Sequence, residues 1–533
     1  MSTDPSRPGS GLIIARDALL NLLNSLSALV AGMGGSILLS RYLGPQGYGE
    51  YETAIWIVGT GSILLGLGMA ETVRRYVAEL NGKGQPDAAF RLVAAILVCQ
   101  TAAALPAVLA LAVRPWWLAN LLRQPQLAEY VALSAAAVAP EVLSSILQNA
   151  LMGLRRFKWL TGVGVLKSAL TFAAVAVGVS FDLGIAGLLR LLIAVYVATM
   201  AVYGLLVLRL WLRFRVSRSS GIVALGPPVR FAAAIFFTLL MDAMVWQRSG
   251  IFFLSLMSTP AEIAFYNLGS SVGYVALSTV PLSLAGVLTP ALAERWGAAD
   301  HDGVKRIHST GVQVSAAICL PLALGGIAVA QPFVQAVYGP QFERAAPVLA
   351  LALISTTMAV LASNASSALQ AVRRADVLAK VAAAAAVLNV VLCMALVPAR
   401  GAAGAAFSNM IVRTVSALIL LGTTGRLLGL RYEMKLVSRA AFAAGACALL
   451  AAVVVRSGPP PLLLPLSVVA AGLLYVLLLL VTGWSRAVGA HDLVAEALSL
   501  TRQSLGIGRA GAGAGCAVHT SGEAADLSDA GQE

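Results

Sequence analysis

Long apolar runs alternate with short polar segments along most of the chain, from about residue 18 to residue 483. Each run approaches the roughly 20 apolar residues that an α-helix needs to cross a bilayer. The runs lack the residue-by-residue alternation of membrane β-barrel strands. The pattern predicts transmembrane helices over residues 18–40, 53–70, 92–113, 131–151, 160–181, 184–208, 231–257, 262–290, 309–337, 346–370, 375–397, 402–424, 437–455 and 462–483.

The first half of this pattern recurs in the second half. An aromatic, glycine-rich turn from Leu38 to Tyr51 separates two apolar runs, and a degenerate copy follows at constant spacing. Leu and Ala matches are common in an apolar chain, but Pro, Tyr and charged residues are scarce here, so their shared spacing indicates an internal repeat. The matched pairs are Gly35 and Gly250, Ser40 and Ser255, Pro45 and Pro260, Tyr51 and Tyr266, Arg155-Arg156 and Arg373-Arg374, and Gly184–Gly187 and Gly401–Gly404.

Each repeat contains an even number of predicted helices, so both copies enter the membrane from the same side. Repeats of this kind are parallel and are related by an axis along the membrane normal. We therefore predict an all-α polytopic membrane protein of about 14 transmembrane helices, arranged as two parallel six-helix repeats plus two C-terminal helices. The predicted parts are a cytoplasmic N-terminus (1–17), an N-terminal lobe (18–208), a basic cytoplasmic linker (209–230), a C-terminal lobe (231–424), helices 13 and 14 (425–483) and a disordered cytoplasmic tail (484–533).

Composition supports the membrane prediction. Hydrophobic residues make up 59% of the chain and charged residues 11%, whereas about a quarter of residues are charged in soluble proteins. The net charge of +13 lies in short loops between apolar runs, which argues against nucleic-acid binding. The five cysteines are scattered, without metal or disulfide spacing, and we expect no cofactor.

The Lys and Arg residues between the runs predict the orientation of the protein. Loops on the cytoplasmic side of a membrane carry an excess of these residues. With both termini inside, most of them fall in cytoplasmic segments. The segments on the other side hold only Arg41, Arg114, Arg123, Arg344, Arg400 and Arg456. We expect a multi-pass protein of the inner (cytoplasmic) membrane with both termini in the cytoplasm.

Charged residues within the apolar runs are candidates for function. Each costs about 2.5–3.5 kcal/mol at the centre of a membrane helix, so those present usually face a cavity or a partner. Basic side chains predominate, which favours an anionic substrate such as a phosphate or pyrophosphate head group. The candidates are Arg190, Arg248, Arg413 and Lys167 for substrate binding, and Asp242 and Glu141 for a coupling ion.

These residues also have structural interpretations. Lys167 and Arg190 could extend their charged ends toward the membrane interface. Asp242 could neutralise a basic residue on another helix. Enzyme signatures are missing from the sequence, which has no Walker loop, no metal-ligand cluster and no long soluble domain. The short external loops argue against a membrane polymerase or glycosyltransferase, and we predict that the protein is not an enzyme.

Five sequence motifs resemble those of a known family. They are Arg41-Tyr-Leu-Gly-Pro-Gln-Gly-Tyr-Gly-Glu-Tyr51, Gly66-Leu-Gly68 with Arg74, Leu151-Met-Gly-Leu-Arg-Arg-Phe157, Tyr338-Gly-Pro-Gln-Phe342 and Gly401-Ala-Ala-Gly404. With these motifs the chain resembles, over residues 15–485, the bacterial polysaccharide transporters. These are the Wzx-like flippases of the multidrug/oligosaccharidyl-lipid/polysaccharide exporter superfamily.

The resemblance implies two six-helix lobes around a central cavity. It also implies that undecaprenyl-pyrophosphate-linked oligosaccharide is flipped to the periplasmic leaflet by alternating access. The implied partners are this polyprenyl-pyrophosphate-linked substrate, membrane lipids, a polysaccharide polymerase and glycosyltransferases. Two alternatives stay open. A flippase for the peptidoglycan lipid precursor shares the 14-helix plan, and a cation-coupled drug antiporter would need an acidic cavity.

Overall fold

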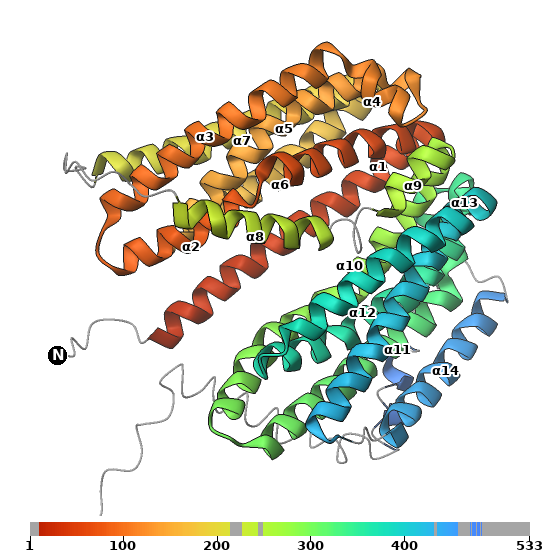
Figure 1. The fold of residues 1–533 in the computed structure, drawn as a ribbon. Coiled ribbons are helices and arrows are strands. Elements are labelled where there is room, and N and C mark those ends of the chain that lie inside the picture. Colours follow the sequence, from red (N-terminus) through yellow and green to blue (C-terminus); the bar gives the residue numbers. More distant parts are fainter. Residues whose placement is uncertain are drawn as a thin grey trace, which may run out of the picture. The chain divides into compact units, whose positions relative to one another are not determined.

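The computed structural model describes residues 10–213, 226–242, 249–430, 434–456 and parts of 470–481. These residues are helical, and no strand occurs among them (Figure 1). The helices are α1 (Ser10–Gly66), α2 (Met69–Gly82), α3 (Pro86–Val113), α4 (Pro115–Leu121), η1 (Pro125–Leu127), α5 (Ala128–Gly153), α6 (Phe157–Ser180), α7 (Gly184–Arg213), α8 (Gly226–Asp242), α9 (Ser249–Met257), α10 (Pro260–Gly297), α11 (His301–Tyr338), η3 (Pro340–Phe342), α12 (Ala345–Ala371), α13 (Ala375–Leu428) and α14 (Met434–Arg456).

The helices described below lie in one unit, Leu19–Val488, apart from the first residues of α1. Within the described part of the chain, nine helices are long and apolar enough to cross a membrane. Two of these, Leu23–Gly66 and Asp376–Leu428, each correspond to two predicted spans joined through a kink. The predicted all-helical, polytopic class is confirmed. The predicted span 462–483 lies mostly outside the described residues.

Glycines mark the two kinks. In α1 the backbone breaks at Gly44 (φ 65°), directly before Pro45, and in α13 it breaks at Gly401 (φ 52°). Residues with a Cβ adopt such positive φ values at a cost, whereas glycine adopts them freely. The residue that Gly401 matches in the first repeat, Gly184, also has a positive φ (63°) and begins α7.

The short turns between helices repeat as well. Gly84 and Ala299 are separated along the chain by the same number of residues as matched pairs such as Gly35 and Gly250. They adopt left-handed φ values of 69° and 58°. Arg155 and Arg373 do the same, with φ values of 54° and 60°. In all four turns this residue donates its N–H to the carbonyl three positions earlier, at 3.0 or 3.1 Å. The sequence repeat therefore corresponds to a repeat of backbone geometry.

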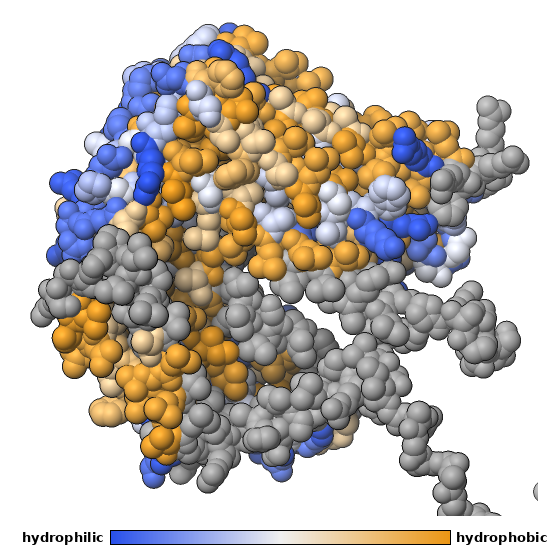
Figure 2. Space-filling model, turned by 180° about the vertical axis from the view of Figure 1, so that it is seen from behind, coloured by the Kyte–Doolittle hydropathy of each residue, from blue (hydrophilic) through white to orange (hydrophobic). Residues whose placement is uncertain are grey.

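Large hydrophobic side chains are exposed on the helix surfaces. Figure 2 shows hydrophobic residues over much of one face, and side chains such as Val98, Phe181 and Phe442 are 70%, 73% and 81% exposed. Soluble proteins rarely expose apolar surface on this scale. This surface suits the lipid contact of a transmembrane protein.

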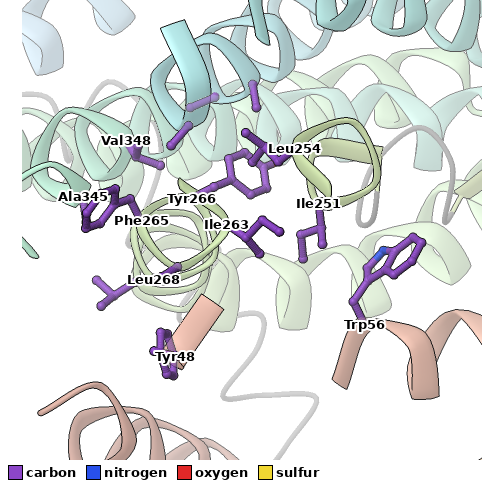
Figure 3. Packing of buried hydrophobic residues seen from close by; sticks show 14 of the residues in the cluster. Tyr48, Trp56, Ile251, Leu254, Ile263, Phe265, Tyr266, Leu268, Ala345 and Val348 are labelled. Carbon is purple, nitrogen blue, oxygen red and sulfur yellow. The ribbon is translucent and has the colours of Figure 1, made fainter. Parts of the chain in front are cut away.

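The main core joins the two repeats near the glycine-rich turn. The ring of Tyr48 meets that of Phe342 edge to face at 6.2 Å, and Phe265 meets Phe342 at 6.1 Å. Figure 3 shows Tyr48 near α10, which carries Phe265, Tyr266 and Leu268. The aromatic residues of the turn therefore pack against α10 and η3 of the other repeat.

Candidate functional site

A polar cavity of about 340 Å³ lies within the second repeat. Helices α9, α10, α12 and α13 form its wall, and contacts between α10 and α12 and between α12 and α13 are extensive. The lining residues are Ile251, Tyr266, Asn267, Ser270, Ser271, Tyr274, Val275, Ala352, Ser355, Thr356, Ala406, Asn409 and Arg413. Nine of these thirteen residues carry a polar group, and the one charged residue in this lining is Arg413.

Helical spacing brings these polar residues to one place. On α10, Tyr266, Ser270 and Tyr274 recur every four residues and so share one face of the helix. On α13, Asn409 and Arg413 also lie four residues apart. Two polar stripes on otherwise apolar helices therefore face the same cavity.

A hydrogen bond connects two walls of the cavity. The Ser355 hydroxyl on α12 donates to Asn409 Oδ1 on α13 at 2.9 Å. Tyr266 and Ser270 on α10 line the same cavity as Asn409 and Arg413 on α13. Buried polar groups are costly without such partners. The wall is thus organised before any ligand binds.

The lining defines what the cavity can bind. A guanidinium offers a planar pair of donors that matches phosphate oxygens, and the surrounding hydroxyls and amides can bond to the hydroxyls of a sugar. Tyr274 is 48% exposed, so its ring offers a flat apolar surface. The arrangement suits an anionic or polyhydroxylated ligand.

Two of the predicted residues pair with each other in the first repeat. Lys167 Nζ on α6 lies 2.8 Å from Glu141 Oε2 on α5, and both side chains are about one-third exposed or less. The ammonium group of Lys167 also lies 4.9 Å from the ring centre of Tyr196 on α7. This ion pair joins the substrate-binding and coupling-ion candidates, and their charges offset each other.

Arg190, the third predicted residue of the first repeat, lies apart from the cavity. It is on α7, where its Nη2 pairs at 3.2 Å with Glu129 at the start of α5. Both side chains are more than 60% exposed. The structure therefore brings Arg413 into a cavity and does not bring Arg190 to the same place.

The remaining two predicted residues are not placed. Arg248 lies outside the described residues. Asp242 is the last residue of α8, and its side chain lies outside the described part.

Sequence reasoning missed most of the cavity lining, although a signal was present. The polar residues Tyr266, Asn267, Ser270, Ser271 and Tyr274 fall at helical spacing inside the predicted span 262–290. The candidate residues were chosen among charged side chains in the spans, so this uncharged stripe was not included. In the described part of the chain, no group of three His, Cys, Asp or Glu residues could hold a metal ion.

A family profile for polysaccharide biosynthesis proteins matches residues 38–347, more than half of the chain. None of the curated proteins compared with the sequence matches it.

Solved transporter structures are similar to this fold. One is the lipid II flippase MurJ in an inward closed conformation, with a TM-score of 0.72 and 12% identity, over 90% of this chain and 100% of that one. Another is an inward-facing multidrug resistance MATE family transporter of the MOP superfamily, with a TM-score of 0.60 and 14% identity, over 76% and 98%.

A third is the Vibrio cholerae MATE transporter VcmN in the bent form, with a TM-score of 0.52 and 16% identity, over 79% and 97%. The chain shares the fold of these transporters.

Proposed function

The chain belongs to the polysaccharide biosynthesis protein family, and from this premise we propose that it flips lipid-linked oligosaccharides across the membrane. The substrate would be an oligosaccharide on undecaprenyl pyrophosphate, moved to the outer leaflet by alternating access. The family, the transporter fold and the polar cavity with Arg413 support this proposal. The protein is a transporter and not an enzyme.

The observation that carries the proposal is the position of Arg413 in the cavity. Arg413 lies on α13, eleven residues beyond Ala402, the first residue after the kink. This separation is roughly 16 Å along a helix. A pyrophosphate that enters the membrane loses its hydration shell, and fixed cationic donors must replace that water. We propose that Arg413 supplies those donors, while Asn267, Ser271 and Asn409 bond to the sugar hydroxyls.

The proposed orientation places both termini in the cytoplasm of the cell, with the protein in its inner membrane. The distribution of Lys and Arg residues supports it. Cysteine labelling should reach Gln46 and Gln341 from outside, and positions near Arg156 and Arg215 from inside. Labelling of position 215 from the outside would contradict this orientation.

The proposed partners follow from the substrate. Glycosyltransferases would build the oligosaccharide on its lipid at the inner leaflet, and a polysaccharide polymerase would use it at the outer leaflet. Annular membrane lipids would surround the exposed apolar surface.

A second candidate function is to flip the lipid precursor of peptidoglycan. The higher TM-score and fuller coverage of the lipid II flippase favour this alternative over drug export. A drug antiporter is also disfavoured by the lining described here, because its charged residue is basic. Both lipid substrates carry a pyrophosphate, so the function of Arg413 would be the same.

The test is complementation in bacteria that lack their own oligosaccharide flippase. Arg413→Ala should reduce glycan export by at least about tenfold, because loss of a charge-assisted hydrogen bond has that effect. Arg413→Lys should restore export only in part, since lysine lacks the planar pair of donors. Arg248→Ala tests the predicted arginine outside the described residues.

Arg190→Ala is the matched control and should export as the parent does, because Arg190 is exposed and paired with Glu129. Membrane levels of all variants must be equal. Normal export by Arg413→Ala at equal levels would overturn the proposed role of the cavity. Rescue of a strain that lacks its peptidoglycan precursor flippase would establish the second candidate instead.

A further inference from the structure

We propose that Glu262 is a positioning residue that holds the two helical walls of the cavity together. Glu262 lies in the first turn of α10, and its Oε2 accepts the backbone N–H of Ala402 in α13 at 2.7 Å. Its other oxygen lies 3.5 Å from the guanidinium of Arg344, and the Glu262 side chain is 20% exposed. One carboxylate thus connects α10, α13 and the segment before α12.

The kink in α13 explains why a carboxylate binds at this point. The first N–H groups of a helix have no partner within the helix. Gly401 interrupts α13, and Ala402 begins its second half. A side-chain carboxylate is well suited to this position, because it accepts the free N–H and its charge complements the helix dipole.

The space at the kink fits this interaction closely. A Cβ on Gly401 would lie 2.4 Å from Glu262 Oε2. A side chain at that position would therefore displace the carboxylate, in addition to the strain of a positive φ. The interaction therefore depends on both the glycine at the kink and the glutamate on α10.

The hydrogen bond lies in line with the polar stripes of the cavity. Glu262 precedes Tyr266 by four residues on α10, and Ala402 precedes Ala406 by four residues on α13. Residues at this spacing share one helix face. Arg413 lies farther along that face of α13. Release of Ala402 would therefore let the second half of α13 move against α10 and change the distance between Arg413 and Tyr266.

A thiol reporter measures this movement without any substrate. Ser270→Cys is placed in a background with Cys99→Ser and Cys516→Ser, and the rate of its reaction with a water-soluble maleimide is measured on purified protein. Glu262→Ala should raise this rate by at least about tenfold, the effect expected for loss of a hydrogen bond to a charged group. Glu262→Gln should stay close to the parent, because its amide oxygen still accepts the N–H.

Glu294→Ala, the same substitution near the other end of α10, is the matched control and should leave the rate unchanged. The proposal is wrong if Glu262→Ala reacts like the parent. It is also wrong if Glu262→Gln reacts as fast as Glu262→Ala, since the acceptor would then be irrelevant.

Its relevance for transport rests on the proposed function, and glycan export separates the two. If Glu262→Ala accelerates labelling while Arg413→Ala exports normally, the positioning role of Glu262 stands and the proposed function of the cavity fails. If Arg413→Ala abolishes export while Glu262→Ala leaves labelling unchanged, the positioning role of Glu262 fails and the proposed function stands. When both hold, Glu262→Ala should lower export and Glu262→Gln should restore it.

Discussion

Arg41 of the first repeat is hydrogen-bonded to Val337 of the second, with 2.9 Å between the guanidinium Nε and the carbonyl oxygen. Its Nη2 donates to the neighbouring carbonyl of Ala336 at 2.7 Å. These carbonyls belong to the last turn of α11, where helix carbonyls lack partners within the helix. A cation at a helix C-terminus is favourable for the same reason. Arg41 thus links α1 to the end of α11.

We predict that Arg41→Ala weakens the contact between the repeats. Loss of these bonds should change the ratio of conformations with α1 and α11 in contact to those with the two helices apart by only roughly 2–10-fold, because the charged guanidinium is exposed to solvent. Distances between spin labels on α1 and α11 measure that ratio. Arg41→Lys separates the effect of the charge from that of the two hydrogen bonds, because lysine keeps the charge but cannot make the same two-nitrogen contact. An unchanged distance distribution in Arg41→Ala would contradict the prediction.

A second contact between the repeats involves backbone alone. A Cβ on Gly49 would lie 1.7 Å from the carbonyl oxygen of Pro260. We predict that Gly49→Ala forces α1 and α10 apart and lowers the melting temperature. Gly32→Ala on the same helix is the control, since a Cβ there meets nothing within 4 Å. It should be neutral or stabilising, by about 0.5–1 kcal/mol. Thermal unfolding in detergent compares the two, and equal melting temperatures would refute the prediction.

Much of the fold could be predicted because its signals are local. Apolar runs and their length predict membrane helices, and scarce residues at constant spacing predicted the repeat. The positive φ values that turn residues such as Gly84 and Arg155 share with their counterparts in the second repeat confirm it. The breaks predicted between spans are present at Gly44 and Gly401, where the backbone is not helical and a single positive φ redirects the chain without a long loop.

The site was less predictable because it depends on contacts between distant residues. Charge alone singled out Arg413, which lines the cavity, and equally Lys167 and Glu141, which pair together. Nothing in their spacing of 26 residues indicates that pairing. The span predicted at 309–337 starts earlier in the structure, because α11 begins at His301, and this longer helix buries His308.

Asp300 provides a prediction about pH. Its carboxylate caps α11 by accepting the N–H of Gly303 at 2.8 Å, and Arg295 donates to its other oxygen at 2.8 Å. The Gly303 N–H first, and then Arg295, lower the pKa of Asp300 below its usual 3.8. A lowered pKa means that the stabilisation is fully present above the unfolded-state value and is lost as the pH falls through the folded-state value.

We therefore expect Asp300→Asn to match the parent in melting temperature under strongly acidic conditions and to fall below it at neutral pH. Asparagine still caps a helix, but it neither titrates nor pairs with Arg295. Melting temperatures measured from about pH 1 to pH 7 cover this range. Asp302→Asn, at the next acidic position, is the control. A constant difference between Asp300→Asn and the parent at every pH would rule out the titration of Asp300 as its cause.

The ion pair of Lys167 and Glu141 has either a structural role or a role in ion coupling, and substitution of the two residues distinguishes these roles. Removing one partner leaves a single charge within a membrane span, which costs about 2.5–3.5 kcal/mol at the membrane centre. Both side chains are about one-third exposed or less, so Lys167→Met and Glu141→Gln should each destabilise the protein by at most about that amount. The double variant should recover part of the loss, because no charge remains unpaired.

A double-mutant cycle on stability, with glycan export measured for the same four proteins, decides between the two roles. For a structural pair, the double variant should regain both stability and export. For the coupling-ion role that the sequence predicted for Glu141, the double variant should be stable but still unable to export, because the titratable carboxylate is gone. Tyr196→Phe is the matched control, because it keeps the ring that Lys167 contacts at 4.9 Å and should leave both measurements unchanged. Additive effects of the single substitutions would show that the two side chains are not coupled, contrary to their 2.8 Å contact.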